Sequence, residues 1–166
     1  AGMAYAADAM VQTIERELGE EKLDGVLLSH SHYDHVAGLP ALRKRWPELK
    51  TYASGRAQEI LVKPGALATI RRLSGEAAAA AELPWEEDYR DEDLRIDVAL
   101  EDGETVQIGE HQVFAFATVG HTRCSMSYVV DGEVMLCSET VGVMGQEGGY
   151  MPSFLVDYLE AEASIR

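Results

Sequence analysis

The segment Ser29-His30-Ser31-His32-Tyr33-Asp34-His35-Val36-Ala37-Gly38 carries most of the information in this 166-residue sequence. It contains three of the chain's five histidines together with one aspartate. An apolar run, Val26-Leu27-Leu28, precedes it and is bounded by turn residues, a pattern that predicts a short buried strand. The sequence therefore predicts imidazole and carboxylate groups gathered at the C-terminal end of a strand.

The spacing of these side chains suits metal ions. Imidazole and carboxylate together are the ligand set of Zn²⁺, and they also suit Fe or Mn. Residues i and i+2 of an extended segment point the same way, so His30 and His32 can chelate one ion. Asp34 and His35 follow as the chain turns into a helix and can face a second ion. Two metals about 3.5–4 Å apart would hold a hydroxide between them, with Asp34 ligating the second metal and orienting this nucleophile.

The quoted segment resembles the signature of the metallo-β-lactamase-fold hydrolases. Val119-Gly120-His121-Thr122 is similar to that family's Pro-Gly-His-Thr turn, with Val119 in place of the proline. The resemblance implies that His121 is the third ligand of the first metal. It also implies that Glu139 stands where the family has an aspartate bridging both metals. The alternatives for Glu139 are an acid beside the site that binds no metal, or a site with one metal.

The fold implied by the resemblance is α/β, an αββα sandwich. Residues 1–166 are expected to form a single partial domain, incomplete at both termini, with a helical insert at about residues 54–83. The family's opening strands and its last metal-binding histidine have no counterpart here, so this chain alone is not expected to be a competent catalyst. Periodicity near 3.6 predicts helices at 7–18, 39–46, 56–62, 67–83 and 154–166, and alternation predicts strands at 94–100, 105–108, 113–117, 126–130 and 133–137.

Composition excludes several functional classes. With 14 Lys and Arg against 29 Asp and Glu, the net charge of −15 makes the chain a poor candidate for binding nucleic acid or an anionic membrane. No apolar run approaches the roughly 20 residues of a membrane-spanning helix. Two cysteines cannot form a disulfide framework, and no secretory signal is visible, so a reducing cytoplasm is the expected location.

The resemblance implies a hydrolase that uses a metal-bound hydroxide, with two Zn²⁺ as the expected cofactor, to cleave an ester, thioester or lactone bond of a small molecule. One alternative is a redox member of the fold with two irons, although such proteins typically carry a glutamate where this chain has His32. Another is a non-catalytic member or an inactive fragment that serves as a binding module. An incomplete sandwich would expose an apolar face, which would invite a homo-oligomer or a complementing chain.

Several further residues have expected roles. Tyr150 and Phe154, beside the Gly-rich segment 142–149, are candidates for substrate contact. Trp85 and Tyr89 are candidates for a pocket rim, the alternative being plain surface packing. Candidate hydrogen-bond partners for the histidine ring nitrogens that do not bind metal are Ser29, Ser31 and Thr122. Cys124 and Cys137 are expected to be buried in the core. His111 is expected to be exposed.

Overall fold

The computed structural model describes residues 1–19, 22–85, 87–141, 143–144, 150–151 and 154–165. Its strands form a parallel sheet A, ordered β1-β2-β3, an antiparallel sheet B, ordered β4-β5-β6-β7, and the small pair β8-β9. The strands are β1 (Gly25–Leu27), β2 (Lys50–Ser54), β3 (Val98–Leu100), β4 (Thr105–Ile108), β5 (His111–Ala117), β6 (Met126–Val130), β7 (Val134–Leu136), β8 (Val143–Met144) and β9 (Tyr150–Met151).

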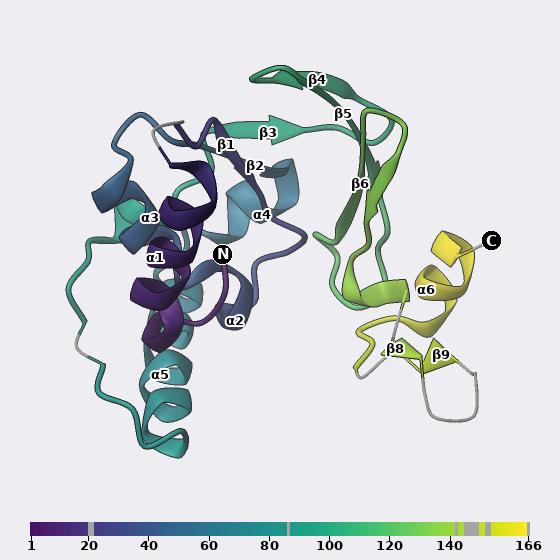
Figure 1. The fold of residues 1–166 in the computed structure, drawn as a ribbon. Helices are drawn as coiled ribbons and strands as arrows, with labels where there is room; N and C mark the ends of the chain where they lie inside the picture. The colour runs from purple at the N-terminus through teal and green to yellow at the C-terminus, as the bar shows by residue number, and fades with distance from the viewer. Residues whose placement is uncertain (20–21, 86, 142, 145–149, 152–153, 166) are drawn as a thin grey trace.

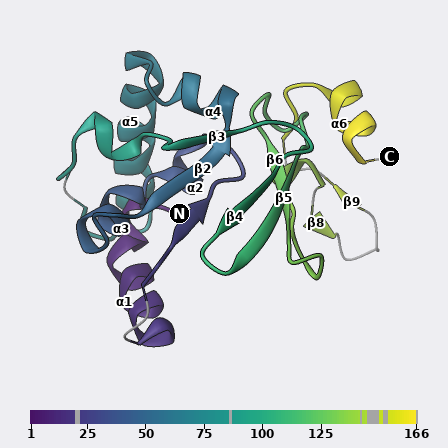
Figure 2. The ribbon, with the colours of Figure 1, turned by 90° about the horizontal axis from the view of Figure 1, so that it is seen from above.

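The helices lie on the outer sides of the two sheets. Figure 1 shows α1, α3 and α5 on one side of sheet A and α6 beyond sheet B, and Figure 2 shows the same order from above. This order of helices, sheet, sheet and helix confirms the predicted α/β sandwich. The α-helices are α1 (Ala7–Leu18), α2 (Tyr33–Val36), α3 (Leu39–Arg45), α4 (Gly55–Ile60), α5 (Pro64–Ala80) and α6 (Tyr158–Ile165), and the 3₁₀ helices are η1 (Ala4–Ala6), η2 (Asp91–Leu94) and η3 (Glu139–Val141).

None of the helices in the described residues is long and apolar enough to cross a membrane. The helices instead cover an apolar core. One part of this core, including Leu28, Leu39 and Leu42, lies beneath the helices. The other part, including Leu100 and Tyr128, joins side chains of sheet A to side chains of sheet B. The two apolar layers account for the sandwich, because each sheet buries a face against its neighbour.

Buried hydrogen bonds tie the two sheets together where β1 ends. The Tyr128 hydroxyl donates to the Leu28 carbonyl oxygen at 2.7 Å. The Met126 N–H donates to the Ser29 carbonyl oxygen at 2.8 Å. On the neighbouring strand, the Ser54 hydroxyl donates to the Cys124 carbonyl oxygen, also at 2.8 Å. The histidine segment that follows β1 is thereby fixed against the start of β6.

Some elements differ from the sequence prediction. The expected strand at 94–100 shortens to β3, because the chain first forms η2 and then bends toward α3. The Arg95 carbonyl oxygen accepts from the Arg43 guanidinium and the Thr51 hydroxyl instead of joining a strand ladder. The first strand is half-buried, not buried, because β1 is an edge strand of sheet A.

The sequence also predicts wrongly that Cys137 is buried. Cys137 is exposed, whereas Cys124 is buried as expected. Cys137 directly follows β7, the edge strand of sheet B. Val134, Met135 and Leu136 of that strand are also exposed, at 55%, 51% and 45%. Strand alternation predicts burial only for the face that another layer covers, and the exposure of all three residues of β7 shows that neither of its faces is covered in the described part of the chain.

A buried arginine holds α3 to sheet A. The Arg43 side chain is only 6% exposed and forms a 2.7 Å ion pair with the Asp97 carboxylate. Its guanidinium also donates to the Leu49 carbonyl oxygen and the Thr51 hydroxyl. Burial alone would raise the pKa of Asp97, but the hydrogen bonds from Arg43 and Thr51 outweigh burial and lower it. The Asp97 carboxylate therefore stays ionised and neutralises the buried guanidinium of Arg43.

Replacing Arg43 with alanine should destabilise the fold by about 2–3 kcal/mol, because the half-buried Asp97 carboxylate keeps only the exposed Arg95 as its cation and the hydrogen bonds of the guanidinium to Leu49 and Thr51 are lost. Urea unfolding followed by circular dichroism measures this change. The matched control is Arg72→Ala, since Arg72 is exposed and pairs with Glu76 one helical turn away. The control should change stability by no more than about 0.5 kcal/mol. Equal effects of the two substitutions would contradict the structural role of Arg43.

Candidate metal centre

Six side chains from four separate segments converge beside the C-terminal end of β1. The pair His30 and His32 lies in the extended turn between β1 and α2, whose N-cap residue is His32. The other four are Asp34 and His35 on α2, His121 in the loop between β5 and β6, and Glu139 at the start of η3. The structure thus brings together all six residues that the sequence singled out.

The first group joins three imidazoles. His30 Nε2 lies 3.1 Å from His32 Nδ1, and His32 Nδ1 lies 3.1 Å from His121 Nε2. A tetrahedral zinc with bonds of 2.0–2.1 Å requires ligand nitrogens about 3.3 Å apart. The three nitrogens therefore face a common point at close to the spacing that such an ion requires.

Burial favours the neutral form of two of these imidazoles, those of His30 and His32. His30 is fully buried, and burial, followed by the neighbouring charges of His35 and His32, lowers the pKa of His30 to about 2. Burial and then His121 likewise lower the pKa of His32. A neutral imidazole keeps a nitrogen lone pair, which is the form that binds a metal.

The second group is organised by the Glu139 carboxylate. Its Oε1 lies 3.0 Å from His35 Nε2, and its Oε2 lies 2.9 Å from His121 Nε2. The carboxylate thus spans from the first histidine group to His35. Asp34 lies on the His35 side, with its Oδ2 3.5 Å from His35 Nε2. His30, His35 and Glu139 form a second trio whose donor atoms lie within 4.8 Å of one another.

Two ring nitrogens have partners on the side away from the cluster. Ser29 Oγ lies 3.0 Å from His30 Nδ1, as expected. His121 Nδ1 lies 2.7 Å from the Phe154 carbonyl oxygen, which can only accept, so Nδ1 donates there and Nε2 is the nitrogen that faces the cluster. Ser31 and Thr122 were predicted for such roles, but each hydroxyl contacts Cys124 Sγ. The Phe154 carbonyl has no side-chain signal that sequence reasoning could have used.

The loop that carries His121 is pinned to α6. Gly120 has φ +135°, and a Cβ there would lie 2.7 Å from the Ala161 backbone nitrogen. The Gly120 carbonyl oxygen accepts from the N–H groups of Val156 and Asp157. Only glycine allows this approach, which explains why glycine precedes His121.

Sequence reasoning also missed a buried group of hydroxyls beneath the cluster. Thr118 Oγ1 lies 2.9 Å from Ser127 Oγ and 2.7 Å from Ser138 Oγ. Thr140 Oγ1 accepts from the His121 N–H at 3.2 Å. All four hydroxyl residues are buried, and they join the His121 loop to the segment carrying Glu139. Isolated serines and threonines in different segments give no pattern from which this network could be predicted.

Of the two residues expected to contact substrate, Phe154 lies beside the cluster and the side chain of Tyr150 is not described. Phe154 is 58% exposed, and its ring centroid lies 6.1 Å from that of His121, so it borders the cluster. Tyr150 lies in β9, and its side chain is outside the described residues. His111 is exposed and pairs with Asp131, as expected for a turn residue.

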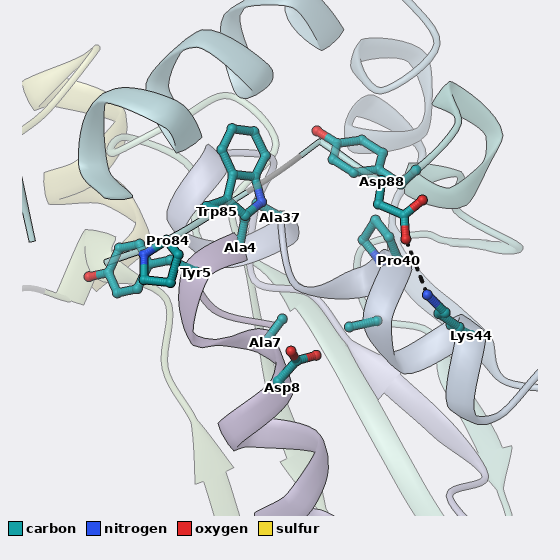
Figure 3. A pocket seen from close by; sticks show the side chains of 12 residues that line it. Ala4, Tyr5, Ala7, Asp8, Ala37, Pro40, Lys44, Pro84, Trp85 and Asp88 are labelled. Carbon is teal, nitrogen blue, oxygen red and sulfur yellow. Dashed lines mark hydrogen bonds and ion pairs between the residues drawn. The ribbon is translucent and has the colours of Figure 1, made fainter. Parts of the chain in front are cut away.

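Trp85 and Tyr89 do line a pocket (Figure 3). This cavity of about 260 Å³ lies between η1, α3 and the loop after α5, and Tyr5 forms part of its wall. An ion pair of 3.2 Å between Lys44 and Asp88 crosses one side of it. None of the six cluster residues belongs to its described lining. The prediction of a pocket rim is therefore confirmed, at a place separate from the histidine cluster.

Two curated relatives are named hydroxyacylglutathione hydrolase. The protein from Acidiphilium cryptum is 32% identical over 139 residues, which cover 84% of this chain and 43% of that protein. The protein from Cereibacter sphaeroides is 32% identical over 125 residues, which cover 75% of this chain and 36% of that protein. The chain thus spans less than half the length of these relatives.

Solved structures share the fold. A metallo-beta-lactamase superfamily protein from Sulfolobus tokodaii matches with a TM-score of 0.64 at 23% identity, covering 87% of this chain and 56% of that one. The BLEG-1 B3 metallo-beta-lactamase matches with a TM-score of 0.58 at 23% identity, covering 96% of this chain and 68% of that one. The family model of the metallo-beta-lactamase superfamily matches residues 1–138. The histidine segment and the two packed sheets agree with this match. The chain belongs to the metallo-beta-lactamase superfamily.

Proposed function

We propose that this chain carries the dinuclear metal centre of a hydrolase that cleaves thioesters. His30, His32 and His121 would hold the first metal, and His35 and Asp34 the second. Glu139 would bridge the two. Zinc is the proposed metal, because imidazole nitrogens and carboxylate oxygens in these numbers suit it.

One observation carries the proposal, namely the position of the Glu139 carboxylate. Its two oxygens lie 2.9 Å from His121 Nε2 and 3.0 Å from His35 Nε2, one in each proposed ligand group. An acid that merely neighboured the site would have no reason to approach both groups. A glutamate is one methylene longer than an aspartate, and η3 places its backbone so that the carboxylate still reaches both imidazoles.

The chemistry follows from the groups that surround this point. Bound zinc would lower the pKa of a coordinated water to about 7 and polarise a carbonyl oxygen. Asp34 would accept a hydrogen bond from the attacking water and hold it in line with the carbonyl carbon. The water oxygen then bonds to that carbon, the C–S bond breaks, and the water's proton passes to the thiolate that leaves. Ser29 and the Phe154 carbonyl would keep His30 and His121 oriented.

The preference for thioesters rests on the two curated relatives, whose name denotes hydrolysis of a hydroxyacyl thioester of glutathione. Of the three substrate classes that the sequence left open, namely esters, thioesters and lactones, this name favours thioesters. The di-iron alternative is disfavoured by His32, which stands where the resemblance places a glutamate in redox members. Metal analysis distinguishes the two directly, since that alternative requires iron.

Replacing His32 with alanine should reduce the bound metal from about two zinc ions per chain to one or fewer. The imidazole of His32 sits between His30 and His121, so its loss leaves the first group with two nitrogens. Plasma emission spectroscopy after exhaustive dialysis gives the stoichiometry. The matched control is His111→Ala, because His111 is exposed and pairs with Asp131, away from the histidine cluster. Unchanged metal content in the His32 variant would remove His32 from the ligand set.

Glu139→Gln should release one of the two metals while retaining the other. Glutamine keeps the side-chain length but loses the negative charge that would neutralise two adjacent cations. We expect at least a 100-fold weaker second binding step, beyond the roughly 10–100-fold typical of changes to outer-shell partners. Competition with a chromophoric chelator measures both steps. Glu133→Gln, in the exposed turn after β6, serves as the control, and equal behaviour of the two variants would exclude bridging.

The proposed reaction requires metal throughout. The intact, zinc-loaded protein that contains this chain should release free thiol from an acyl thioester, a chelator should abolish the release, and added Zn²⁺ should restore it. Thiol release is followed spectrophotometrically with a disulfide reagent. The proposed function is wrong if the intact, zinc-loaded protein releases no thiol, or if release continues after complete removal of metal.

A further inference from the structure

A cavity of about 220 Å³ opens beside His32, next to the proposed metal centre. We infer that this cavity binds an apolar acyl group of about six to eight carbon atoms, which makes medium-chain acyl thioesters the substrate class. The inference rests on the proposed function, because it assigns the acyl part of that substrate. One water molecule occupies about 30 Å³ in the liquid, so the cavity has room for about seven atoms of similar size.

One face of α5 forms the far wall of the cavity. Ala66, Thr69, Ile70 and Leu73 recur at i, i+3, i+4 and i+7, which places them along a single stripe of the helix. Ile60, at the end of α4, extends the same wall. Figure 1 shows α5 beside α2, the helix that carries Asp34 and His35. The wall therefore faces the segment where hydrolysis would occur.

Two hydroxyl groups of the lining already have partners within the protein. The Ser31 hydroxyl lies 3.3 Å from Cys124 Sγ. The Thr69 hydroxyl donates to the Gly65 carbonyl oxygen at 2.8 Å. Among the lining residues that the structure describes there is no acid, lysine or arginine, although the chain as a whole is strongly charged. A polar acyl group would lose hydrogen bonds to water here without replacing them, whereas an alkyl chain loses none.

The position of His32 links the cavity to the reaction. Its Nδ1 faces His30 and His121, and its side chain forms part of the cavity lining. Tyr33, the next residue, lines the cavity as well. A thioester carbonyl held near the histidine cluster would therefore direct its alkyl chain along the stripe on α5.

The test is a series of N-acetylcysteamine thioesters with acyl chains from two to ten carbons. This carrier is uncharged, so the net charge of −15 does not bias the comparison. Each methylene that enters the cavity should raise kcat/KM about three- to fourfold, with the rise ending near eight carbons. A value of kcat/KM that does not depend on chain length would overturn the inference while leaving the proposed hydrolysis intact.

A matched pair of variants locates the binding site. Ala66→Phe should fill the cavity and lower the ratio of the kcat/KM for the octanoyl thioester to that for the acetyl thioester at least about tenfold. A loss of this size corresponds to two to three methylenes that no longer enter the cavity. Ala68→Phe places the same side chain on an exposed position of α5 outside the cavity lining and should leave this ratio unchanged. Equal ratios in the two variants would mean that the acyl chain binds elsewhere.

Calorimetry separates failure of this inference from failure of the proposed function. Octanoate, the product of the reaction, should bind the zinc-loaded chain at least about tenfold more tightly than acetate, and Ala66→Phe should remove the difference. If no thioester is hydrolysed but octanoate shows this preference, the proposed function fails and the acyl site stands. If octanoate and acetate bind equally, the inference fails whatever the rates are.

Discussion

Three hydrogen bonds at the ends of the strands fix the distance between the two halves of the proposed site. Tyr128 donates to Leu28, Met126 donates to Ser29, and Ser54 donates to Cys124. These bonds join sheet A to the start of β6 within a few residues of the histidines on both sides. Convergence of the imidazoles therefore depends on the packing of the two sheets. A shift of either sheet by one residue would move every donor atom out of reach.

The cluster also shows a conflict between folding and function. Bringing several imidazoles and two half-buried carboxylates together with their lone pairs facing one another costs free energy when no cation lies between them. A bound metal reverses the sign of this contribution, because metal binding to a preformed site stabilises the folded state. The tight core around Leu28, Leu39 and Tyr128 supplies the stability that holds the site in shape before metal binds.

Local chemistry was predictable from the sequence, and contacts between distant segments were not. The turn at Asp131-Gly132 has φ +53° and +73°, as the dipeptide predicts, and helix α1 ends before Gly19 at φ +62°. The histidine segment was equally readable, since i and i+2 spacing fixes direction on an extended chain. Burial of Cys137 was predicted wrongly because it depends on what covers the edge of sheet B, and the α5 cavity depends on how α5 meets α2.

The position of the Glu139 carboxylate depends on the two residues beside it in the sequence. Ser138 is tied through its hydroxyl to Thr118 and through its N–H to Ser127, and the Thr140 hydroxyl accepts from the His121 N–H. The residues on either side of Glu139 are thus anchored to the loop that carries His121. Because the backbone is held at both sides, the extra methylene changes only the reach of the carboxylate. The position of this acid is therefore a property of the buried hydroxyl network as much as of its own side chain.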